Sequence, residues 1–418
     1  MTEKLLQYIW QFQYFNRTSL ETSTAETLQI IYPGQANTNQ GPDFLNARIR
    51  IGNTLLAGCI ELHIKTSDWK RHGHDHDSNY NNVILHVVYQ HDTNDPDIPV
   101  LELAPRIPGM LLEKYERLML TTESVACGNS IMGVKPIIWT AWKDRLIAER
   151  LTRKATDIID LLHASNNHWE EVCWHLLARH FGGKVNHEAF ESIARSIPIN
   201  LLARHKQQIH QLEALLLGQS GLLDSDFDEA YPKLLKREYQ FLQQKYQLRK
   251  GTIPVQFLRM RPGNFPTIRL AQLAMLIHTV SHLFSHILEA KSLDELKSQF
   301  KVSANDYWHY HYRFDEPSGY KIKNLGSDMI DHLIINTICP LLFAYGSFHS
   351  NESYKTKALF WLEKTVAEFN AITNHFKQLG IKVSSAFDSQ ALIELKNSYC
   401  IPKRCLQCSI GVCILKGE

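Results

Sequence analysis

Apolar residues recur with helical spacing at the start of the chain and alternate as in strands shortly afterwards. Leu5, Ile9, Phe12 and Phe15 lie on one helical face, and helix is predicted over the first thirty residues. Residues 32–42, rich in glycine, proline and asparagine, predict a loop. Strands are predicted at residues 47–51, 55–65 and 82–89, with a turn at 52–53 and one more strand at 99–103.

Beyond Gly109 the pattern becomes helical. Helices are predicted over residues 110–120, 137–163, 169–180, 227–248, 268–290, 293–300, 329–345, 354–369 and 389–398, with another ending near residue 223. The predicted organisation is an α/β module at residues 1–125, a mostly helical domain at 136–395 and a cysteine-containing tail at 396–418. In the run 268–290, His278, His282 and His286 form one stripe, which predicts a polar seam between packed helices.

The composition indicates a cellular compartment but says little about binding partners. With 44% hydrophobic and 21% charged residues, the chain has the balance of a folded globular protein. Lys+Arg 45 against Asp+Glu 43 gives a net charge of +2, which neither requires nor excludes a polyanionic partner. Neither a secretory leader nor an uninterrupted apolar stretch of about 20 residues is found, so no membrane association and a cytoplasmic location are expected. Cys59, Cys127, Cys173 and Cys339 are scattered singly, as buried thiols of a reducing compartment are.

The predicted strand at residues 55–65 carries the most informative chemistry. Cys59, Glu61, His63 and Lys65 alternate with apolar residues and therefore share one face of the strand. A carboxylate, an imidazole and an ammonium in line are costly to bury without a function or a metal. Asp43, just before the preceding strand, could join Glu61 in binding Mg²⁺ or Mn²⁺, an ion that polarises a phosphodiester and lowers the pKa of bound water.

Two resemblances follow from these residues. Gly41-Pro42-Asp43-Phe44 followed by Ile60-Glu61-Leu62-His63 resembles the PD-(D/E)xK nuclease superfamily, whose core is helix, three strands, helix and strand. The resemblance implies a restriction-endonuclease-like core in which Asp43 and Glu61 bind the metal. His63 holds the position of the motif lysine, so the base is either His63 or Lys65, one pleat further on. The chain as a whole is also similar to an uncharacterised bacterial family, a domain of unknown function, through residues 41–44, 67–69, 83–88 and 259–266 and the tail cysteines.

Residues near this strand are candidates to support the site. The loop after it is rich in histidine and aspartate, and an adjacent strand would bring His86 beside Glu61 or His63. The full set of candidate supporting residues is Gln35, Asp68, His72, His74, Asp77 and His86. The same residues also fit a solvated loop and a histidine that satisfies a backbone carbonyl.

Two further groups suggest ligands. Cys400, Cys405 and Cys408, with Cys413 as a fourth sulfur, have a spacing that could hold zinc or an iron–sulfur cluster, which some nucleases of the resembled superfamily carry after the catalytic core. Cys413 fits a buried apolar role equally well. Arg259, Arg261 and Arg269 flank a proline-rich segment before a helix, where guanidinium groups either bind phosphate or form ion pairs between domains.

Three functions are consistent with these patterns. The first is a metal-dependent nuclease that cleaves DNA or RNA, with Arg259, Arg261 and Arg269 as backbone contacts. The second is a non-catalytic nucleic-acid or protein scaffold with a degenerate nuclease core and a structural metal, suggested by the replacement of the expected lysine by His63. The third is zinc-dependent hydrolysis of a small phosphoester at His72, His74 and Asp77. Nucleotide-binding loops and a hydrolase nucleophile elbow are not found.

Overall fold

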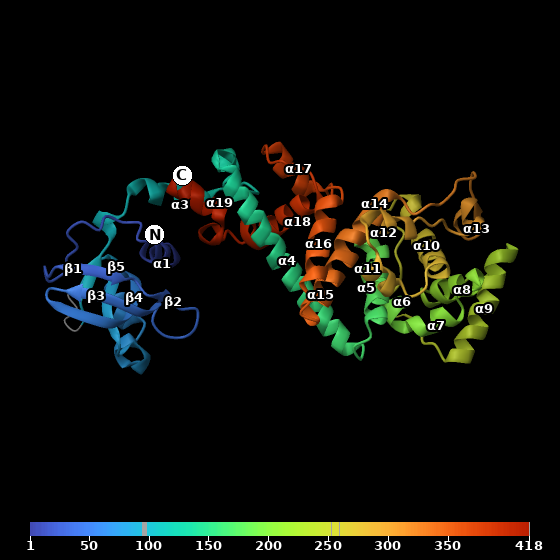
Figure 1. The fold of residues 1–418 in the computed structure, drawn as a ribbon, viewed down its shortest axis with the longest axis horizontal. Coiled ribbons are helices and arrows are strands. Elements are labelled where there is room, and N and C mark those ends of the chain that lie inside the picture. Colours follow the sequence, from blue (N-terminus) through green and yellow to red (C-terminus); the bar gives the residue numbers. More distant parts are fainter. Residues whose placement is uncertain (94–97, 252, 259, 418) are drawn as a thin grey trace. The chain divides into compact units, whose positions relative to one another are not determined.

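The computed structural model describes residues 1–93, 98–251, 253–258 and 260–417. It divides into two compact units: Met1–Trp142 together with Lys396–Glu418, and Lys143–Leu395. The first unit contains a mixed sheet and the cysteine tail, and the second is built mainly of helices (Figure 1). The chain is therefore an α/β module plus a mostly helical region, as the hydrophobic pattern predicted.

The sheet of the first unit joins antiparallel and parallel strands. Its strands are β1 (Leu28–Tyr32), β2 (Gln35–Ala36), β3 (Phe44–Ile51), β4 (Thr54–Lys65), β5 (Val83–Gln90) and β6 (Val100–Glu102). Their order is β1-β3-β4-β5-β6, with β2 paired to β3. The pairs β1–β3 and β3–β4 are antiparallel, whereas β4–β5 and β5–β6 are parallel. The strand expected at residues 99–103 is β6.

The alternation along β4 decides which side chains face the core. Ile60 and Leu62 are 0% and 1% exposed and pack in one cluster with Leu5 and Ile9 of α1 (Glu3–Phe12). Since successive residues of a strand point to opposite faces, Glu61 and His63 lie on the other face. The connection between β4 and β5 passes over that face. It contains α2 (Asp68–Arg71) and two single turns of 3₁₀ helix, η1 (His74–His76) and η2 (Ser78–Tyr80).

The prediction of helix over the first thirty residues was wrong beyond α1. The helix ends at Phe12, and Gln13 follows in a left-handed conformation with φ 56°. Residues 28–32 instead form β1, where Ile30 pairs with Ile49 of β3. Pairing with a distant strand supplied backbone partners that the local apolar spacing could not indicate.

The helices outnumber the strands. They are α3 (Gly109–Leu120), α4 (Pro136–Ala164), α5 (Trp169–Phe181), α6 (Gly183–Ser196), α7 (Ile199–Arg204), α8 (Ile209–Gln219), α9 (Ala230–Tyr246), α10 (Pro266–Thr279), α11 (Leu283–Glu289), α12 (Leu293–Gln299), α13 (Asp306–His309), α14 (Ser327–Leu333), α15 (Cys339–Phe348), α16 (Glu352–Lys364), α17 (Ala371–Gln378), α18 (Ala386–Leu395) and α19 (Ser409–Lys416). A short hairpin, β7 (His311–Arg313) and β8 (Glu316–Pro317), follows α13. A π-helical turn at Ile334–Ile338 joins α14 to α15.

The single helix expected over residues 268–290 is two helices. α10 ends at Thr279, and His282 precedes α11 with a left-handed φ of 50°. The predicted stripe of three histidines is therefore interrupted. His278 Nδ1 donates a hydrogen bond to the backbone oxygen of Lys206 at 2.6 Å, which fits a structural polar contact.

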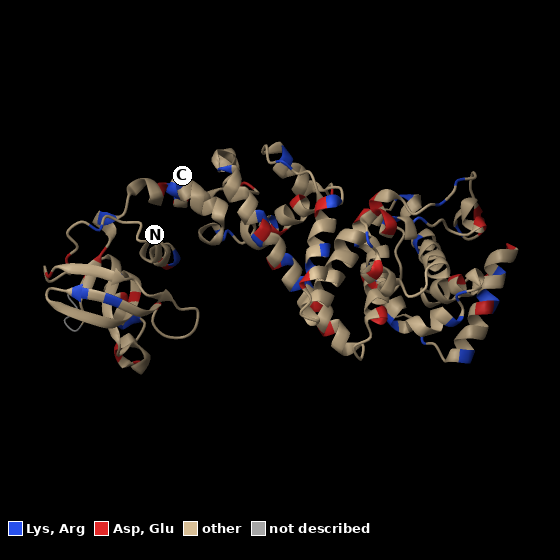
Figure 2. Cartoon of the chain, viewed as in Figure 1, with Lys and Arg blue, Asp and Glu red and all other residues tan. Residues whose placement is uncertain are grey.

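One helical stretch, Ser327–Phe348, is long and apolar enough to cross a membrane by composition, but 72% of its most apolar window is buried inside the protein. Core helices of soluble proteins share this property. Basic and acidic residues are interspersed along the helices of the second unit (Figure 2).

Candidate metal centre

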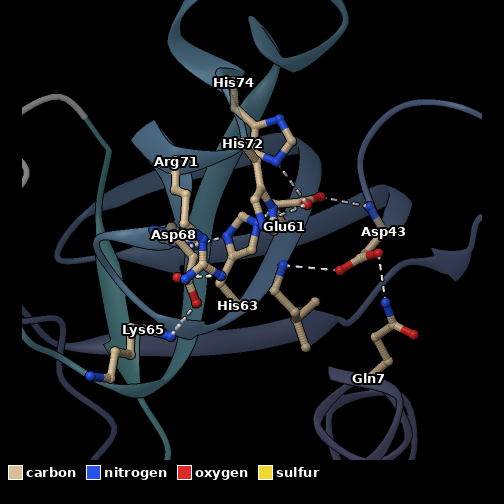
Figure 3. A network of polar contacts seen from close by, with 11 residues as sticks. Gln7, Asp43, Glu61, His63, Lys65, Asp68, Arg71, His72 and His74 are labelled. Carbon is tan, nitrogen blue, oxygen red and sulfur yellow. Dashed lines mark hydrogen bonds and ion pairs between the residues drawn. The ribbon is translucent and has the colours of Figure 1, made fainter. Parts of the chain in front are cut away.

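Two carboxyl groups hold each other in place where β3 begins beside β4. The backbone N–H of Asp43 donates to Glu61 Oε2 at 2.9 Å, and the N–H of Leu62 donates to Asp43 Oδ2 at 3.1 Å. Gln7 on α1 donates from Nε2 to Asp43 Oδ1 at 2.8 Å (Figure 3). The first helix, the loop before β3 and the middle of β4 therefore all contribute to one carboxylate pair.

Burial changes the ionisation of this pair. Desolvation raises the pKa of Asp43 to about 6, although the hydrogen bonds from Gln7 and Leu62 lower it. Desolvation raises the pKa of Glu61 to about 8, and the charge of Asp43 raises it further. Two buried carboxyl groups this close cannot both ionise cheaply without a cation between or beside them. A divalent ion would supply that charge, which makes the donor chemistry suitable for a metal.

Histidines surround the same carboxylate. His63 Nδ1 lies 2.9 Å from His86 Nε2, and His63 Nε2 lies 3.1 Å from His72 Nδ1. Glu61 Oε1 lies 3.6 Å from His63 Nε2 and 3.5 Å from His74 Nε2 (Figure 3). Ligand atoms of His63, His72 and His74 all lie within 4.8 Å of one another. This histidine cluster could hold a metal ion.

Strand register and the β4–β5 connection bring these histidines together. In the parallel pairing, Glu61 lies opposite His86, so the expectation that an adjacent strand brings His86 beside Glu61 or His63 is confirmed. His72 follows α2, and His74 begins η1. The His74 ring stacks on Tyr80, with centroids 3.8 Å apart and planes at 27°. The turns over the sheet therefore orient the imidazoles toward β4.

The histidines have the protonation state that a metal requires. Burial, with the neighbouring histidines, lowers the pKa of His63 to about 2, and burial lowers that of His86 to about 4. Burial also lowers the pKa of His74. Neutral imidazoles bind metals, whereas imidazolium does not. Among the described residues, the buried Nε2 of His74 makes no hydrogen bond, and its contact with Glu61 at 3.5 Å is longer than a normal one. An unsatisfied nitrogen aimed at a carboxylate fits a cation site.

Other predicted residues of this region lie outside the cluster. The side chain of Lys65 is exposed and extends away from Glu61 and His63 (Figure 3), while its backbone N–H donates to Asp68 Oδ2 at 3.0 Å. Asp68 also pairs with Arg71 at 2.8 Å and so holds the turn after β4. Gln35 is exposed on β2. Asp77 caps η2 by accepting from the backbone N–H and side-chain amide of Asn79 at 2.9 and 2.8 Å.

The predicted arginine contacts are only partly described. Arg259 lies outside the described residues. Arg261 is exposed and precedes the short turn Pro262–Asn264. The guanidinium of Arg269 donates to Gln272 Oε1 at 2.9 Å and to Asn264 Oδ1 at 2.6 Å. Arg269 is thus held by neutral acceptors.

The second unit contains a cluster of basic residues around Lys154 of α4. Lys154 on α4 is half-buried, and burial together with Arg150, Arg153 and Arg179 lowers its pKa to about 8. Carboxylates neutralise the arginines: Glu394 pairs with Arg150 and Arg153, and Glu191 pairs with Arg179. Within the described part of the chain, the Lys154 ammonium makes no hydrogen bond or ion pair. A half-buried ammonium that forms no ion pair is a candidate anion contact.

The tail cysteines belong to the first unit. Cys405 and Cys408 are 9% and 6% exposed, and Cys400 is half-buried. Cys127, which the sequence indicated as an isolated buried thiol, packs against the hydrophobic cluster that contains Cys405. Cys413, predicted as the fourth sulfur, is buried on α19 and lines with Cys127 a cavity of about 410 Å³.

Sequence patterns did not indicate a role for Gln7 at the carboxylate pair or for Cys127 beside the tail, because no local motif marks either residue. Gln7 is one polar residue of an amphipathic helix, and only its contact with Asp43 distinguishes it. Cys127 lies far from the tail in sequence and in no recognisable motif. A search for distant single cysteines that could complete the tail set would have raised Cys127 as a candidate.

The fold and this site define the class of protein: a mixed α/β module with a buried carboxylate–histidine cluster, followed by a helical unit. The chain belongs to the family described as "Protein of unknown function (DUF2851)", whose model matches residues 3–371. No curated protein and no solved structure matches the chain.

Proposed function

We propose that the protein is a metal-dependent nuclease that hydrolyses phosphodiester bonds in DNA or RNA at the Asp43–Glu61–histidine cluster. The observation that carries the proposal is the position of Glu61. Its Oε2 accepts the N–H of Asp43, while its Oε1 faces His63 and His74 at 3.6 and 3.5 Å. One carboxylate thus connects the acidic pair to the imidazole cluster.

The residues of the cluster would have separate roles in metal binding and hydrolysis. Asp43 and Glu61 would hold Mg²⁺ or Mn²⁺, and the imidazoles of His63, His72 and His74 extend the donor set toward Mn²⁺ or Zn²⁺. The bound ion supplies Lewis acidity to the phosphoryl oxygen and acidity to a water. His63 stays neutral and is oriented by His86 on its other nitrogen, which suits a metal ligand better than a base, because a pKa of about 2 makes it a weak proton acceptor. The exposed Lys65 is less suited as the base because its side chain extends away.

The order of elements supports a restriction-endonuclease-like core. α1 precedes three antiparallel strands, β1, β3 and β4, and β5 then returns parallel to β4. This order agrees with the first helix, the three strands and the final strand that the Pro42-Asp43 resemblance implies. One difference is the crossover between β4 and β5, where the four-residue α2 and two 3₁₀ turns stand in place of a full helix. These turns carry His72 and His74.

The helical unit would contribute binding to the phosphate backbone. Arg261 is exposed, Arg269 is held only by amide oxygens, and Lys154 has no carboxylate partner among the described residues. Cations in such settings bind phosphates without reading base sequence. Their contribution should appear as salt-dependent affinity for any nucleic acid.

The experiment is cleavage of single- and double-stranded DNA and RNA with Mg²⁺, Mn²⁺ or Zn²⁺, comparing wild type with Glu61→Gln. Glutamine keeps the size of the side chain but removes the anionic ligand. Glu21→Gln, at an exposed position of the same unit, is the matched control. Cleavage by wild type and Glu21→Gln, lost in Glu61→Gln, is the expected result. Equal cleavage by all three proteins would assign the activity to a contaminant and remove the proposal.

The scaffold alternative also has a supporting observation. Both ring nitrogens of His63 and three of the four Asp43–Glu61 carboxyl oxygens have hydrogen-bond partners within the protein. A polar network satisfied to this degree can stabilise a fold without a ligand. This alternative predicts no cleavage by any variant but retained nucleic-acid binding. Phosphoester hydrolysis at His72, His74 and Asp77 is the least supported, since Asp77 caps η2.

A further inference from the structure

A cavity of about 300 Å³ lies among α5, α7, α10 and α11 in the second unit. Its lining residues all fall between His168 and Leu283, so they belong to one compact unit. Pockets that bind small molecules are commonly about 300–1,000 Å³ in volume. Asp43, Glu61 and the histidines of the candidate metal centre belong to the first unit, so this cavity is separate from that site.

The interior of the cavity is apolar. α5 contributes Trp174 and Leu177, each 3% exposed, and α10 contributes two leucines. These are Leu273 and Leu276, each 1% exposed. The indole N–H of Trp174 donates to two backbone oxygens at 3.1 and 2.9 Å, so this side chain presents only carbon to the cavity. An occupant of the interior must therefore be apolar, because a polar group would lose its hydrogen bonds to water there.

Lys206 and Ser281 form a polar edge of the cavity. Both residues line it, and Lys206 Nζ donates to Ser281 Oγ. The hydrogen bond from His278 Nδ1 to the backbone oxygen of Lys206 holds the lysine backbone against α10. Among the described residues, no carboxylate forms an ion pair with the half-buried Lys206 ammonium. Since an ammonium has three donors, Lys206 can donate to a ligand as well as to Ser281.

The turn between α10 and α11 places Ser281 at this edge. α10 ends at Thr279, and His282 has a left-handed φ of 50° before α11 begins. A residue other than glycine keeps this conformation only where its surroundings hold it there. The serine hydroxyl is therefore fixed beside the lysine by the fold of the turn.

Glu170 also lines the cavity, but α11 binds its carboxylate. Oε2 accepts from the backbone N–H of Phe284 and Oε1 from that of Ser285, each at 3.2 Å. These hydrogen bonds hold the negative charge at the start of α11 and compensate it. The charge left for an occupant is that of Lys206, which attracts an anion.

We propose that this cavity binds an apolar carboxylate of about ten carbon atoms, with its chain between α5 and α10 and its head group on Lys206 and Ser281. An apolar cavity of about 150 Å³ is large enough for one benzene ring, so one twice as large holds roughly ten carbon atoms. The ammonium and the hydroxyl then donate charge-assisted hydrogen bonds to the carboxylate. The protein thus has a small-molecule site that is independent of the proposed nuclease.

The test is isothermal titration of the full chain with decanoate, below the concentration at which it forms micelles. Decanol and decylammonium are the comparison ligands, because they share the chain and differ in the charge of the head group. Wild type should bind decanoate more tightly than decanol and should not bind decylammonium. Lys206→Gln should weaken decanoate binding about tenfold or more and leave decanol unchanged. Lys206→Arg should retain the preference for decanoate.

Two controls separate binding from general effects of charge and folding. Arg204→Gln removes a positive charge from the end of α7 at an exposed residue that does not line the cavity, and should bind decanoate as wild type does. Ala203→Phe fills the cavity from its exposed rim and should abolish binding of both decanoate and decanol. Far-ultraviolet circular dichroism checks that the helices of each variant remain.

Three results would overturn the proposal. They are absence of decanoate binding to wild type, equal decanoate affinity in wild type and Lys206→Gln, and undiminished binding in Ala203→Phe. Tighter binding of decylammonium than of decanoate would assign the cavity to a cation through Glu170 and would overturn it too. None of these measurements depends on hydrolysis, so failure here leaves the nuclease proposal standing.

Discussion

The backbone N–H of Asp43 donates to Glu61 Oε2 at 2.9 Å, which makes the loop before β3 a support for the central carboxylate of β4. The Asp43 carboxylate in turn accepts from Leu62, the residue after Glu61. Because each residue holds the other's position, a cation at this point would meet two oriented carboxyl groups with little reorganisation.

Gln7 should act as a positioning residue through Asp43. Gln7→Ala removes the 2.8 Å hydrogen bond that lowers the pKa of Asp43, so this pKa should rise above about 6. Metal-dependent cleavage should then require a higher pH, with its acidic limb shifted upward. The measurement is the pH profile of kcat/KM, and Gln11→Ala, exposed on the same helix, is the control. An unshifted profile in Gln7→Ala would contradict the assignment.

His74 should be needed for metal affinity. His74→Ala removes the buried nitrogen 3.5 Å from Glu61, and affinity for Mn²⁺ or Zn²⁺ should fall roughly tenfold or more. Isothermal titration with each metal measures the loss. His76→Ala is the matched control, because His76 ends the same turn with its side chain 88% exposed. Equal affinities in the two variants would place the metal elsewhere.

Gly411→Ala should loosen the tail. The new Cβ would lie 2.4 Å from Cys405 O, and relieving that overlap should cost on the order of 2 kcal/mol. Hydrogen exchange should become faster in α19 and in the turn that carries Cys405. Gly109→Ala, where no atom lies within 4 Å of the added Cβ, should leave exchange unchanged. Unchanged protection of α19 in Gly411→Ala would show that the helix can shift without loss.

Glu213 should make the helical unit less stable as the pH rises. Burial raises its pKa to about 7 against 4.5 ordinarily, while hydrogen bonds from Tyr231 and Trp308 lower it. The protonated Glu213 carboxyl of the folded protein therefore adds its full contribution to the free energy of unfolding below pH 4.5. This contribution is lost as the pH rises to about 7. Glu213→Gln should remove this dependence and become relatively more stable toward pH 8, by on the order of 3 kcal/mol.

Thermal unfolding followed by tryptophan fluorescence at several pH values measures the difference. Glu363→Gln, exposed on α16, should follow the wild-type dependence. A constant difference between Glu213→Gln and wild type across the range would mean that Glu213 titrates normally in the folded protein.

Lys154 should contribute to nucleic-acid affinity. Lys154→Gln removes the half-buried ammonium that has no carboxylate partner in the described structure. Affinity for DNA or RNA should fall, and the dependence of log affinity on log salt should decrease by about 0.9 for one lost phosphate contact on duplex DNA. Fluorescence anisotropy over a salt series measures both. Lys184→Gln, exposed on α6, should change neither; identical changes in the two variants would indicate a nonspecific charge effect.

The sequence by itself determined the local arrangement of this protein. Alternation along β4 placed Glu61 and His63 on one face, the turn at residues 52–53 joined β3 to β4, and the change of period near Gly109 marked the helical region. These features depend on backbone geometry that repeats every two or 3.6 residues, so a single strand or helix is sufficient to show them.

Only the tertiary structure decided which distant residues meet. The parallel register of β4 and β5 places His86 opposite Glu61, and the turns over β4 place His72 and His74 beside His63. Helix α1 places Gln7 within hydrogen-bonding distance of Asp43. Cys127 joined the tail because Lys396 and Lys403 bind residues 121–124. Such proximity results from burial of apolar faces and pairing of backbone groups far apart along the chain, and no local period encodes it.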